Sequence, residues 1–264
     1  MTVELTDHDT VAGLELEVVG AVATVTLKRP GRRNAMTPSM WHGLAQIPGK
    51  LPGEVRVVVV KGDGPSFCAG IDLRMFDEGV PGEDRGVGPA DPGFDDQLKG
   101  YQAGFRWLRD PAIVSIAAVR GHAIGAGFQL ALACDLRVLA DDAQLCMKEP
   151  ALGLVPDLTG TKPLVDIVGL PRAIELCLTA KTIDATEAER LGLAECVVPP
   201  DDLKSEVDKL IAALLRIDAV AARATKALLM GAHERTLDKQ AEEERKAQAR
   251  LLQARQADQQ AAQQ

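Results

Sequence analysis

The chain has 264 residues, 46% of them hydrophobic, so it can bury a core as one large domain or as one domain with a smaller appendage. Its net charge of −8 argues against nucleic acid or an anionic membrane as a general partner, but it leaves room for a local basic pocket. Five cysteines at irregular spacing, with no CxxC pair, provide no metal framework and are typical of reduced thiols in a cytosol.

The start of the chain contains no targeting pattern. Residues 1–10 are acidic and polar, with neither a basic start nor an apolar core, which predicts that there is no signal peptide. No apolar run is long enough to cross a bilayer. We therefore expect a soluble cytoplasmic protein.

The first quarter of the chain alternates between strand and turn patterns. Residues 14–18 alternate leucine or valine with glutamate, and residues 22–27 are apolar and rich in threonine, which predicts a strand hairpin. Residues 28–35 predict a turn with a basic rim. Thr37 followed by Pro38 predicts the start of an amphipathic helix.

Two strands are each followed by a loop of small residues. The β-branched run 55–60 predicts a strand buried on both faces, and a glycine-rich turn follows at 62–73. A second strand at 113–119 leads into the small residues 121–127 and an apolar helix at 128–133. Loops of such strand-turn-helix units gather at one end of a sheet, where ligands usually bind.

The second small-residue loop permits two interpretations. Its three glycines and two alanines leave the backbone N–H groups open to close approach. At a helix start these groups favour an anion, or a carbonyl oxygen that is gaining negative charge. Close packing of the loop under the helix explains the same small residues.

The remaining patterns complete an α/β chain with a helical end. Residues 76–100 are dense in Gly, Pro and Asp and predict a mobile surface loop, while 144–155 reads as irregular. The other predicted elements are a helical stripe from 98 to 108, a strand at 136–140, a helix starting at Pro171, a helix at 186–191, a strand at 194–198, and helices at 203–217, 219–230 and 237–264. The change in character places a boundary near 200–205.

Five motifs carry a resemblance to a known family. They are KRPGRRNAM at 28–36, GPSFCAGIDL at 64–73, VRGHAIGAGFQLALACDLR at 119–137, EPALGLVPD at 149–157 and LTAKTIDATEAERLGLAECVVP at 178–199. In this order and spacing, across roughly residues 12–230, the chain resembles the crotonase superfamily, also called the enoyl-CoA hydratase/isomerase family. Its final helix lacks the usual closing pattern of an aromatic and a basic residue.

The resemblance implies a fold, a substrate class and an assembly. The fold would be α/β, a spiral of ββα units over residues 1–202 that holds an acyl-CoA site, followed by a helical trimerisation region over 203–264. The assembly would be a homotrimer or a dimer of trimers. Coenzyme A would be part of the substrate, so neither a separate cofactor nor a metal is expected. The metabolic setting would be fatty acid metabolism.

The resemblance also assigns an oxyanion hole and a coenzyme A site. The two backbone N–H donors would be those of Ile71 and Ala126, and a donor of this kind is typically worth about 10²–10³ in rate. The residues expected to line the substrate by their place in the same motifs are Arg29, Arg33, Cys68, Ala69, Gly70, Asp72, Leu73 and Gly125. The two arginines, with Arg32, would meet the phosphates.

The acid–base groups leave the reaction open. Of the two glutamates that hydratases use, the first falls on Gln129, which cannot exchange a proton at pH 7, and the second falls on Glu149. A single retained glutamate resembles the monofunctional enoyl-CoA isomerases. Asp157 matches a third acid of the dienoyl-CoA isomerases. The alternatives are hydration, double-bond isomerisation, acyl-CoA binding without turnover and, least favoured, a scaffold without ligand.

Overall fold

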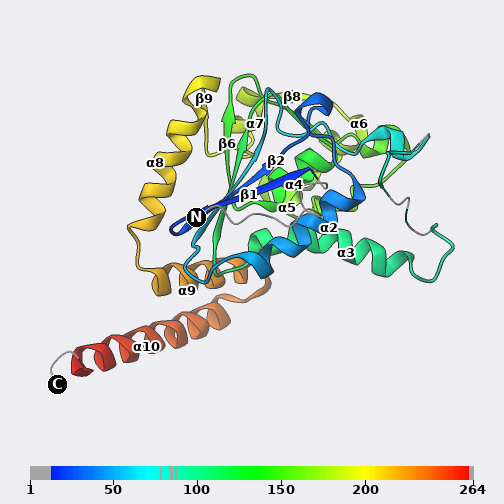
Figure 1. The fold of residues 1–264 in the computed structure, drawn as a ribbon. Helices are drawn as coiled ribbons and strands as arrows, with labels where there is room; N and C mark the ends of the chain where they lie inside the picture. The colour runs from blue at the N-terminus through cyan, green and yellow to red at the C-terminus, as the bar shows by residue number, and fades with distance from the viewer. Residues whose placement is uncertain (1–12, 78, 84–85, 87, 262–264) are drawn as a thin grey trace. The chain divides into compact units, whose positions relative to one another are not determined.

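The computed structural model describes residues 13–77, 79–83, 86 and 88–261 (Figure 1). The stretch predicted to contain no signal peptide lies outside these residues. The chain divides into two compact units, one ending at Ile211 and the other beginning at Ala212. The boundary expected at 202/203 falls inside the first unit, and the roles given to the two regions stay predictions.

The first unit begins with the predicted hairpin. Strands β1 (Leu14–Val19) and β2 (Val22–Leu27) pair antiparallel, with Leu14 opposite Leu27. The leucines of β1 are buried while the glutamates between them are exposed, because successive side chains of a strand point to opposite faces.

A six-stranded sheet forms the centre of this unit. Strands β3 (Val57–Gly62), β4 (Val114–Val119), β6 (Leu136–Ala140) and β9 (Cys196–Val198) continue from β2 in parallel, in the order β1-β2-β3-β4-β6-β9. The four valines of β3 are buried, as predicted for a strand covered on both faces. The loops that follow β3 and β4 therefore leave the same edge of the sheet, since parallel strands share their direction.

A second, three-stranded sheet includes part of the second small-residue segment, 121–127. It consists of β5 (His122–Ile124), β7 (Gln144–Cys146) and β8 (Ile183–Asp184), in the order β5-β7-β8. The sequence did not indicate a strand at 122–124, and the prediction that 144–155 is irregular is wrong for residues 144–146, which form β7. Strands of two or three residues are too short to show a periodicity.

The helices of the first unit largely follow the predictions. Thr37 caps α2 by accepting a hydrogen bond from the Met40 N–H, at 3.4 Å between Oγ1 and N. Helix α3 begins at Phe94, inside the stretch predicted as a loop, because its acidic first turn precedes the apolar stripe. The helices are α2 (Pro38–Gln46), α3 (Phe94–Arg106), α4 (Ala126–Ala133), α5 (Thr161–Val168), α6 (Leu170–Thr179) and α7 (Ala185–Arg190). Helix α5 was not predicted.

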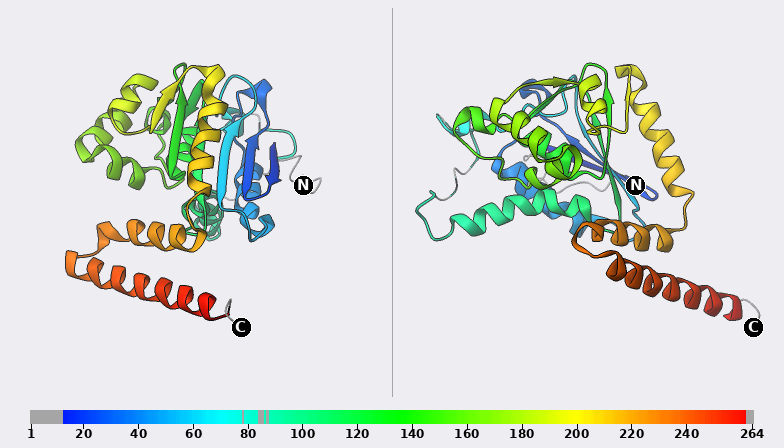
Figure 2. Two further views of the ribbon diagram at one scale, coloured as in Figure 1. Left: turned by 90° about the vertical axis from the view of Figure 1, so that its left-hand side faces the viewer. Right: turned by 180° about the vertical axis from the view of Figure 1, so that it is seen from behind.

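The second unit is helical. Helix α8 (Leu203–Leu215) crosses the division, and α9 (Ala219–Met230) and α10 (Leu237–Ala261) then run side by side (Figure 2). Several apolar side chains of this unit are exposed, among them Leu229 and Leu237. Among the described residues, no helix is long and apolar enough to span a membrane.

Candidate functional site

Two loops far apart in sequence meet at the edge of the central sheet. Cys68 and Ala123 form an isolated parallel β-bridge. The Cys68 N–H donates to the His122 carbonyl at 2.7 Å, and the Ile124 N–H donates to the Cys68 carbonyl at 3.0 Å. These bonds hold the loop at 62–73 against the one at 121–127.

Glycines make this approach possible. A Cβ added to Gly127 would lie 2.4 Å from the Cys68 carbonyl oxygen, and one added to Gly70 would lie 2.9 Å from the Ile124 carbonyl oxygen. Gly70 also has a φ of +98°, which side chains disfavour. Close packing therefore explains two of the small residues, and it brings the predicted oxyanion donors of both loops into one region.

The two predicted oxyanion donors, the N–H groups of Ile71 and Ala126, make no hydrogen bond to the described residues. Met36 donates to the Gly70 carbonyl and accepts from the Asp72 N–H, at 2.7 and 2.8 Å, so the Ile71 N–H between them points to the opposite side. Ala126 is the first residue of α4, where an N–H has no partner in its own helix. Among the described residues, neither N–H has a hydrogen-bond acceptor. Both can serve an oxygen that becomes negatively charged.

Glu149 lies beside the second loop. It opens a short 3-10 turn, Glu149–Leu152, and a Cβ on Gly125 would lie 3.1 Å from its Oε1. That oxygen accepts a hydrogen bond from Nε2 of Gln129 at 2.7 Å. Its Oε2 is buried and, among the described residues, has no hydrogen-bond partner. Gly125 immediately precedes Ala126, so the carboxylate lies near one of the two predicted oxyanion donors.

Burial changes the acidity of Glu149. Loss of water raises its pKa above the usual range of a glutamate, and the negative charge of Asp157 raises it further. Hydrogen bonds, including the one from Gln129, oppose that rise. The result is a carboxyl group whose protonated and ionised forms are closer in free energy at neutral pH than those of an exposed glutamate. This property suits a group that must take up and release a proton.

The Gln129 side chain is buried, and its amide oxygen accepts two hydrogen bonds. The side chain has no exposed surface, and its Oε1 accepts the N–H groups of Leu158 and Gly160 at 2.9 and 3.1 Å. The amide therefore joins α4 to the loop at 157–160 and to Glu149. The sequence indicated that Gln129 cannot exchange a proton, but not that its amide contacts the second acid position.

Asp157 belongs to the same cluster. Burial raises the pKa of its carboxyl group, and Nε2 of Gln102 on α3 donates to its carbonyl oxygen at 2.8 Å. Its influence on the acidity of Glu149 places the two carboxyl groups within electrostatic reach. The structure thus brings together three predicted residues, Gln129, Glu149 and Asp157.

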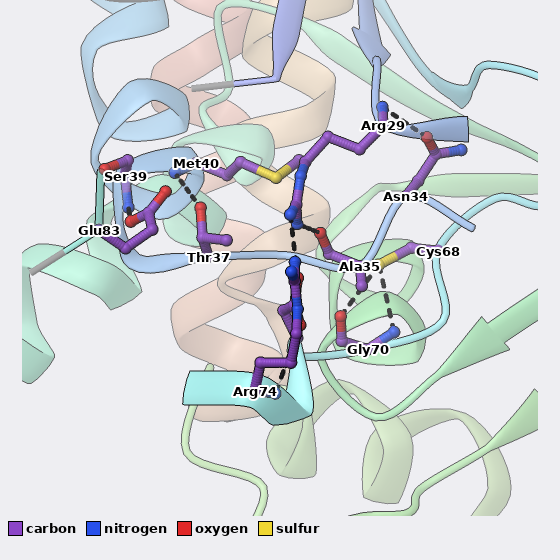
Figure 3. A network of polar contacts seen from close by, with 11 residues as sticks. Arg29, Asn34, Ala35, Thr37, Ser39, Met40, Cys68, Gly70, Arg74 and Glu83 are labelled. Carbon is purple, nitrogen blue, oxygen red and sulfur yellow. Dashed lines mark hydrogen bonds and ion pairs between the residues drawn. The ribbon is translucent and has the colours of Figure 1, made fainter. Parts of the chain in front are cut away.

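The predicted coenzyme A residues divide into groups with different surroundings. Arg29 donates to the Ala35 carbonyl (Figure 3). Through Nη2 it also donates to Oδ2 of Asp72 at 2.9 Å, and Arg74 binds the same carboxylate. These cations hold the pKa of Asp72, which is 5% exposed, well below its usual range. Arg29 and Asp72 thereby tie the basic turn to the first loop, whereas Arg33 is exposed. A contact of either arginine with phosphate stays a prediction.

The other first-loop residues present mainly backbone. Burial raises the pKa of the Cys68 thiol to about 12, so it stays protonated, and its sulfur accepts the Gly70 N–H at 3.4 Å (Figure 3). The Ala69 N–H donates to the Arg33 carbonyl at 2.9 Å, and the Leu73 side chain is 54% exposed. Their contact with substrate likewise stays a prediction.

Sequence reasoning missed Asn34. Its buried side chain accepts the Arg29 N–H at 2.9 Å and donates to the carbonyls of Asp63 and Ser66 at 2.9 and 2.7 Å. Its φ is +55°, a conformation that asparagine tolerates better than most residues. An asparagine within a predicted turn was the available indication. Asn34 thus ties the basic turn to the loop at 62–73 through the carbonyls of Asp63 and Ser66.

Comparisons with known proteins agree with this geometry. The family model described as enoyl-CoA hydratase/isomerase matches residues 17–263. A crystal structure from Thermobifida fusca YX, of a protein named "putative enoyl-CoA hydratase" in complex with CoA, is 57% identical, with a TM-score of 0.91 over 96% of this chain and 98% of that one.

Two curated relatives carry different activities in their names. The short-chain-enoyl-CoA hydratase of Clostridium acetobutylicum is 33% identical over 80% of this chain and 78% of its own length. The mitochondrial Δ(3,5)-Δ(2,4)-dienoyl-CoA isomerase of Dictyostelium discoideum is 30% identical over 82% of this chain and 75% of its own. The chain belongs to the enoyl-CoA hydratase/isomerase family. The predicted family and its α/β fold of ββα units are confirmed.

Proposed function

We propose that this protein moves a proton along the acyl chain of an enoyl-CoA thioester, with Glu149 as its one acid–base group. The thioester carbonyl oxygen would accept hydrogen bonds from the Ile71 and Ala126 N–H groups. Two observations support the substrate class: these donors have no acceptor among the described residues, and a similar structure contains CoA. Coenzyme A enters as part of the substrate, so the reaction needs no further cofactor.

The chemistry we propose is isomerisation of a 3-enoyl to a 2-enoyl thioester. Oε2 of Glu149 removes a proton from C2, and the electron pair moves into the carbonyl to give a dienolate, whose oxygen is stabilised by the two N–H donors. The protonated carboxyl then returns the proton to C4. The double bond ends between C2 and C3, and Glu149 is ionised again.

The observation that carries this proposal is the contact between Gln129 and Glu149. An amide, and not a second carboxylate, bonds Glu149 at 2.7 Å, so only one member of the pair can exchange a proton. One proton-exchanging group suffices for isomerisation, whereas hydration in the manner of the family's hydratases uses two glutamates.

Asp157 favours hydration as a second candidate. Its carboxyl group lies close enough to raise the pKa of Glu149, so a second acid is present, although not at the first hydratase position. In that case Glu149 and Asp157 would share the activation of one water molecule. Acyl-CoA binding without turnover is the remaining alternative.

Two substrates distinguish these reactions. A 3-enoyl-CoA and crotonyl-CoA are supplied separately, and absorbance of the conjugated thioester is followed. Gain of conjugation from the first supports isomerisation and loss from the second supports hydration. Saturable binding with no absorbance change supports a binding protein.

One variant tests the role of Glu149. Glu149→Gln removes the acid–base group and keeps the shape, so we expect turnover to fall by about 10²–10⁴. Glu189→Gln, at an exposed glutamate, is the matched control and should keep normal turnover. If Glu149→Gln retained normal turnover, Glu149 would not be the proton carrier.

A further inference from the structure

We propose that Gln129 is a positioning residue: its amide holds Oε1 of Glu149 and so assigns the proton transfer to Oε2. In turnover this role rests on the proposed function, but the positioning itself can be measured without turnover.

The direction of the Gln129 amide is fixed by its surroundings. Its carbonyl oxygen accepts two backbone N–H groups, from Leu158 at 2.9 Å and Gly160 at 3.1 Å. If the amide were reversed, its NH₂ group would point at the Leu158 and Gly160 N–H groups. These buried donors would then have no acceptor. The NH₂ group must therefore face Glu149, where it meets Oε1 at 2.7 Å.

This fixed donor makes the two oxygens of Glu149 unequal. Oε1 accepts the amide hydrogen bond, whereas Oε2 is buried with no partner among the described residues. A proton added to the carboxyl group would break the amide contact if it were placed on Oε1, but it breaks nothing on Oε2. Oε2 is thus the oxygen that accepts and releases the proton.

Two glycines leave room for the cluster. A Cβ on Gly160 would lie 2.6 Å from Cγ of Gln129, and one on Gly125 would lie 3.1 Å from Oε1 of Glu149. Neighbouring Thr159 has a φ of +71°, an unfavourable conformation for a β-branched residue. The bonds from Gln129 to the N–H groups on either side of Thr159 hold the backbone there. The Gln129 amide thereby fixes two things: the Glu149 carboxylate, which it bonds directly, and the loop at 157–160 that carries Asp157.

Among the described side chains near Glu149, the Gln129 amide is the one that is hydrogen-bonded to its carboxylate. Asp157 on the loop at 157–160, Cys146 on β7 and Cys177 on α6 all lie within electrostatic reach of Glu149. Burial raises the pKa of both thiols, so they stay neutral. Lys148, the preceding residue, is exposed. Among these described groups, only the amide donates a side-chain hydrogen bond to Oε1.

The test replaces the donor in two ways. Gln129→Glu keeps an oxygen for the Leu158 and Gly160 N–H groups but puts a second carboxylate against Oε1, so the pair must share a proton. Gln129→Leu removes the donor and adds no charge. In both variants we expect the pKa of Glu149 to rise, by about one unit or more for Gln129→Glu. Gln144→Glu adds the same charge at an exposed position and is the matched control.

The readouts separate positioning from turnover. Carboxyl-¹³C-glutamate NMR follows each titration, with the Glu149 resonance identified by its absence in Glu149→Gln. In parallel, the acidic limb of the pH–rate profile should move to higher pH in both variants, with about tenfold less activity than wild type near pH 6 for Gln129→Glu.

Each outcome decides one claim. An unchanged Glu149 titration in both variants would overturn the positioning role. So would a uniform loss of rate at every pH with an unmoved acidic limb, which is what a merely structural residue would give. Shifted titrations in a protein with no turnover would support positioning while rejecting the proposed function. If Gln129→Glu did not fold, the Gln129→Leu titration would decide alone.

Discussion

Glu149 carries an oxygen that is buried and unpaired in the described structure, and this arrangement affects stability as well as reactivity. Its pKa is raised in the folded state, so the unfolded chain gives up this proton first as the pH rises. Glu149 therefore lowers stability progressively from about pH 4.3 upward through the folded pKa, and the loss is complete above it.

Glu149→Gln should consequently stabilise the protein. An uncharged amide avoids the cost of burying a carboxylate, and we expect a gain of about 0.5–1 kcal/mol in the free energy of unfolding near pH 7.5. The gain should disappear near pH 4, where the carboxyl group is protonated in both states. Urea unfolding at the two pH values measures the difference, with Glu189→Gln as control. Equal stability of variant and wild type at both values would contradict the argument.

At this scale the sequence located positions better than contacts. The motifs singled out Gln129, Glu149 and Asp157 but left open whether they converge, and in the structure Gln129 bonds Glu149 while Asp157 lies within its electrostatic reach. The sequence could not indicate that the Gln129 amide bonds Glu149, because the amide is oriented by the N–H group of Leu158, 29 residues further along the chain. Contact of Arg29 with a phosphate stays a prediction, and the structure adds its ion pair with Asp72, a long-range pairing that local charge counting does not reveal.

At the scale of elements, the site depends on how tightly α4 approaches the first loop. Gly127 lies inside α4, where an alanine would normally add about 1 kcal/mol of stability. Here the added Cβ would lie 2.4 Å from the Cys68 carbonyl oxygen, and backbone cannot move away cheaply.

Gly127→Ala should therefore reverse the usual effect. We expect the free energy of unfolding to fall by about 1–3 kcal/mol. Turnover should fall as well, since the strain pushes Ala126 and Ile71 apart. Thermal unfolding and steady-state rates provide the two measurements. Gly49→Ala, where no atom lies within 4 Å of the added Cβ, is the control. A stabilised Gly127→Ala would mean that the loops can separate without cost.

Element prediction succeeded where patterns were long enough. The hairpin, the buried valine strand and the capped helix at Thr37 all follow from periodicity and capping. Strands β5, β7 and β8 could not be found, since they are defined by pairing with one another and not by their own sequence. The start of α3 was also placed too late in the chain, because its first turn contains little apolar surface that would show a helical period.

At the scale of the whole molecule, the second unit has apolar surface that its own helices do not cover. Val220 and Leu229 on α9 are 59% and 67% exposed, and Leu237 at the start of α10 is 84% exposed. Apolar side chains of this size, gathered on a small helical unit, are typical of a surface that contacts another subunit. Family resemblance predicts that this subunit is a second copy of the chain.

We therefore expect the protein to form a trimer or a dimer of trimers. Light scattering after size-exclusion chromatography should give three or six times the chain mass of 28.1 kDa. Leu229→Glu should lower that mass by placing a charge in the contact. Lys226→Glu, on the same helix, changes charge at a position that is already polar and serves as comparison. A wild-type mass of 28.1 kDa would contradict the prediction.

The cluster around Gln129 also bears on how the family could change chemistry. Codons for glutamine and glutamate differ at their first base, so one nucleotide change exchanges the two residues. The oxygen that accepts the Leu158 and Gly160 N–H groups exists in both side chains, and Gly160 leaves room for either. A gene encoding this scaffold is thus one point mutation from a site with a carboxylate at the first hydratase position, and selection could cross that step without rebuilding a loop.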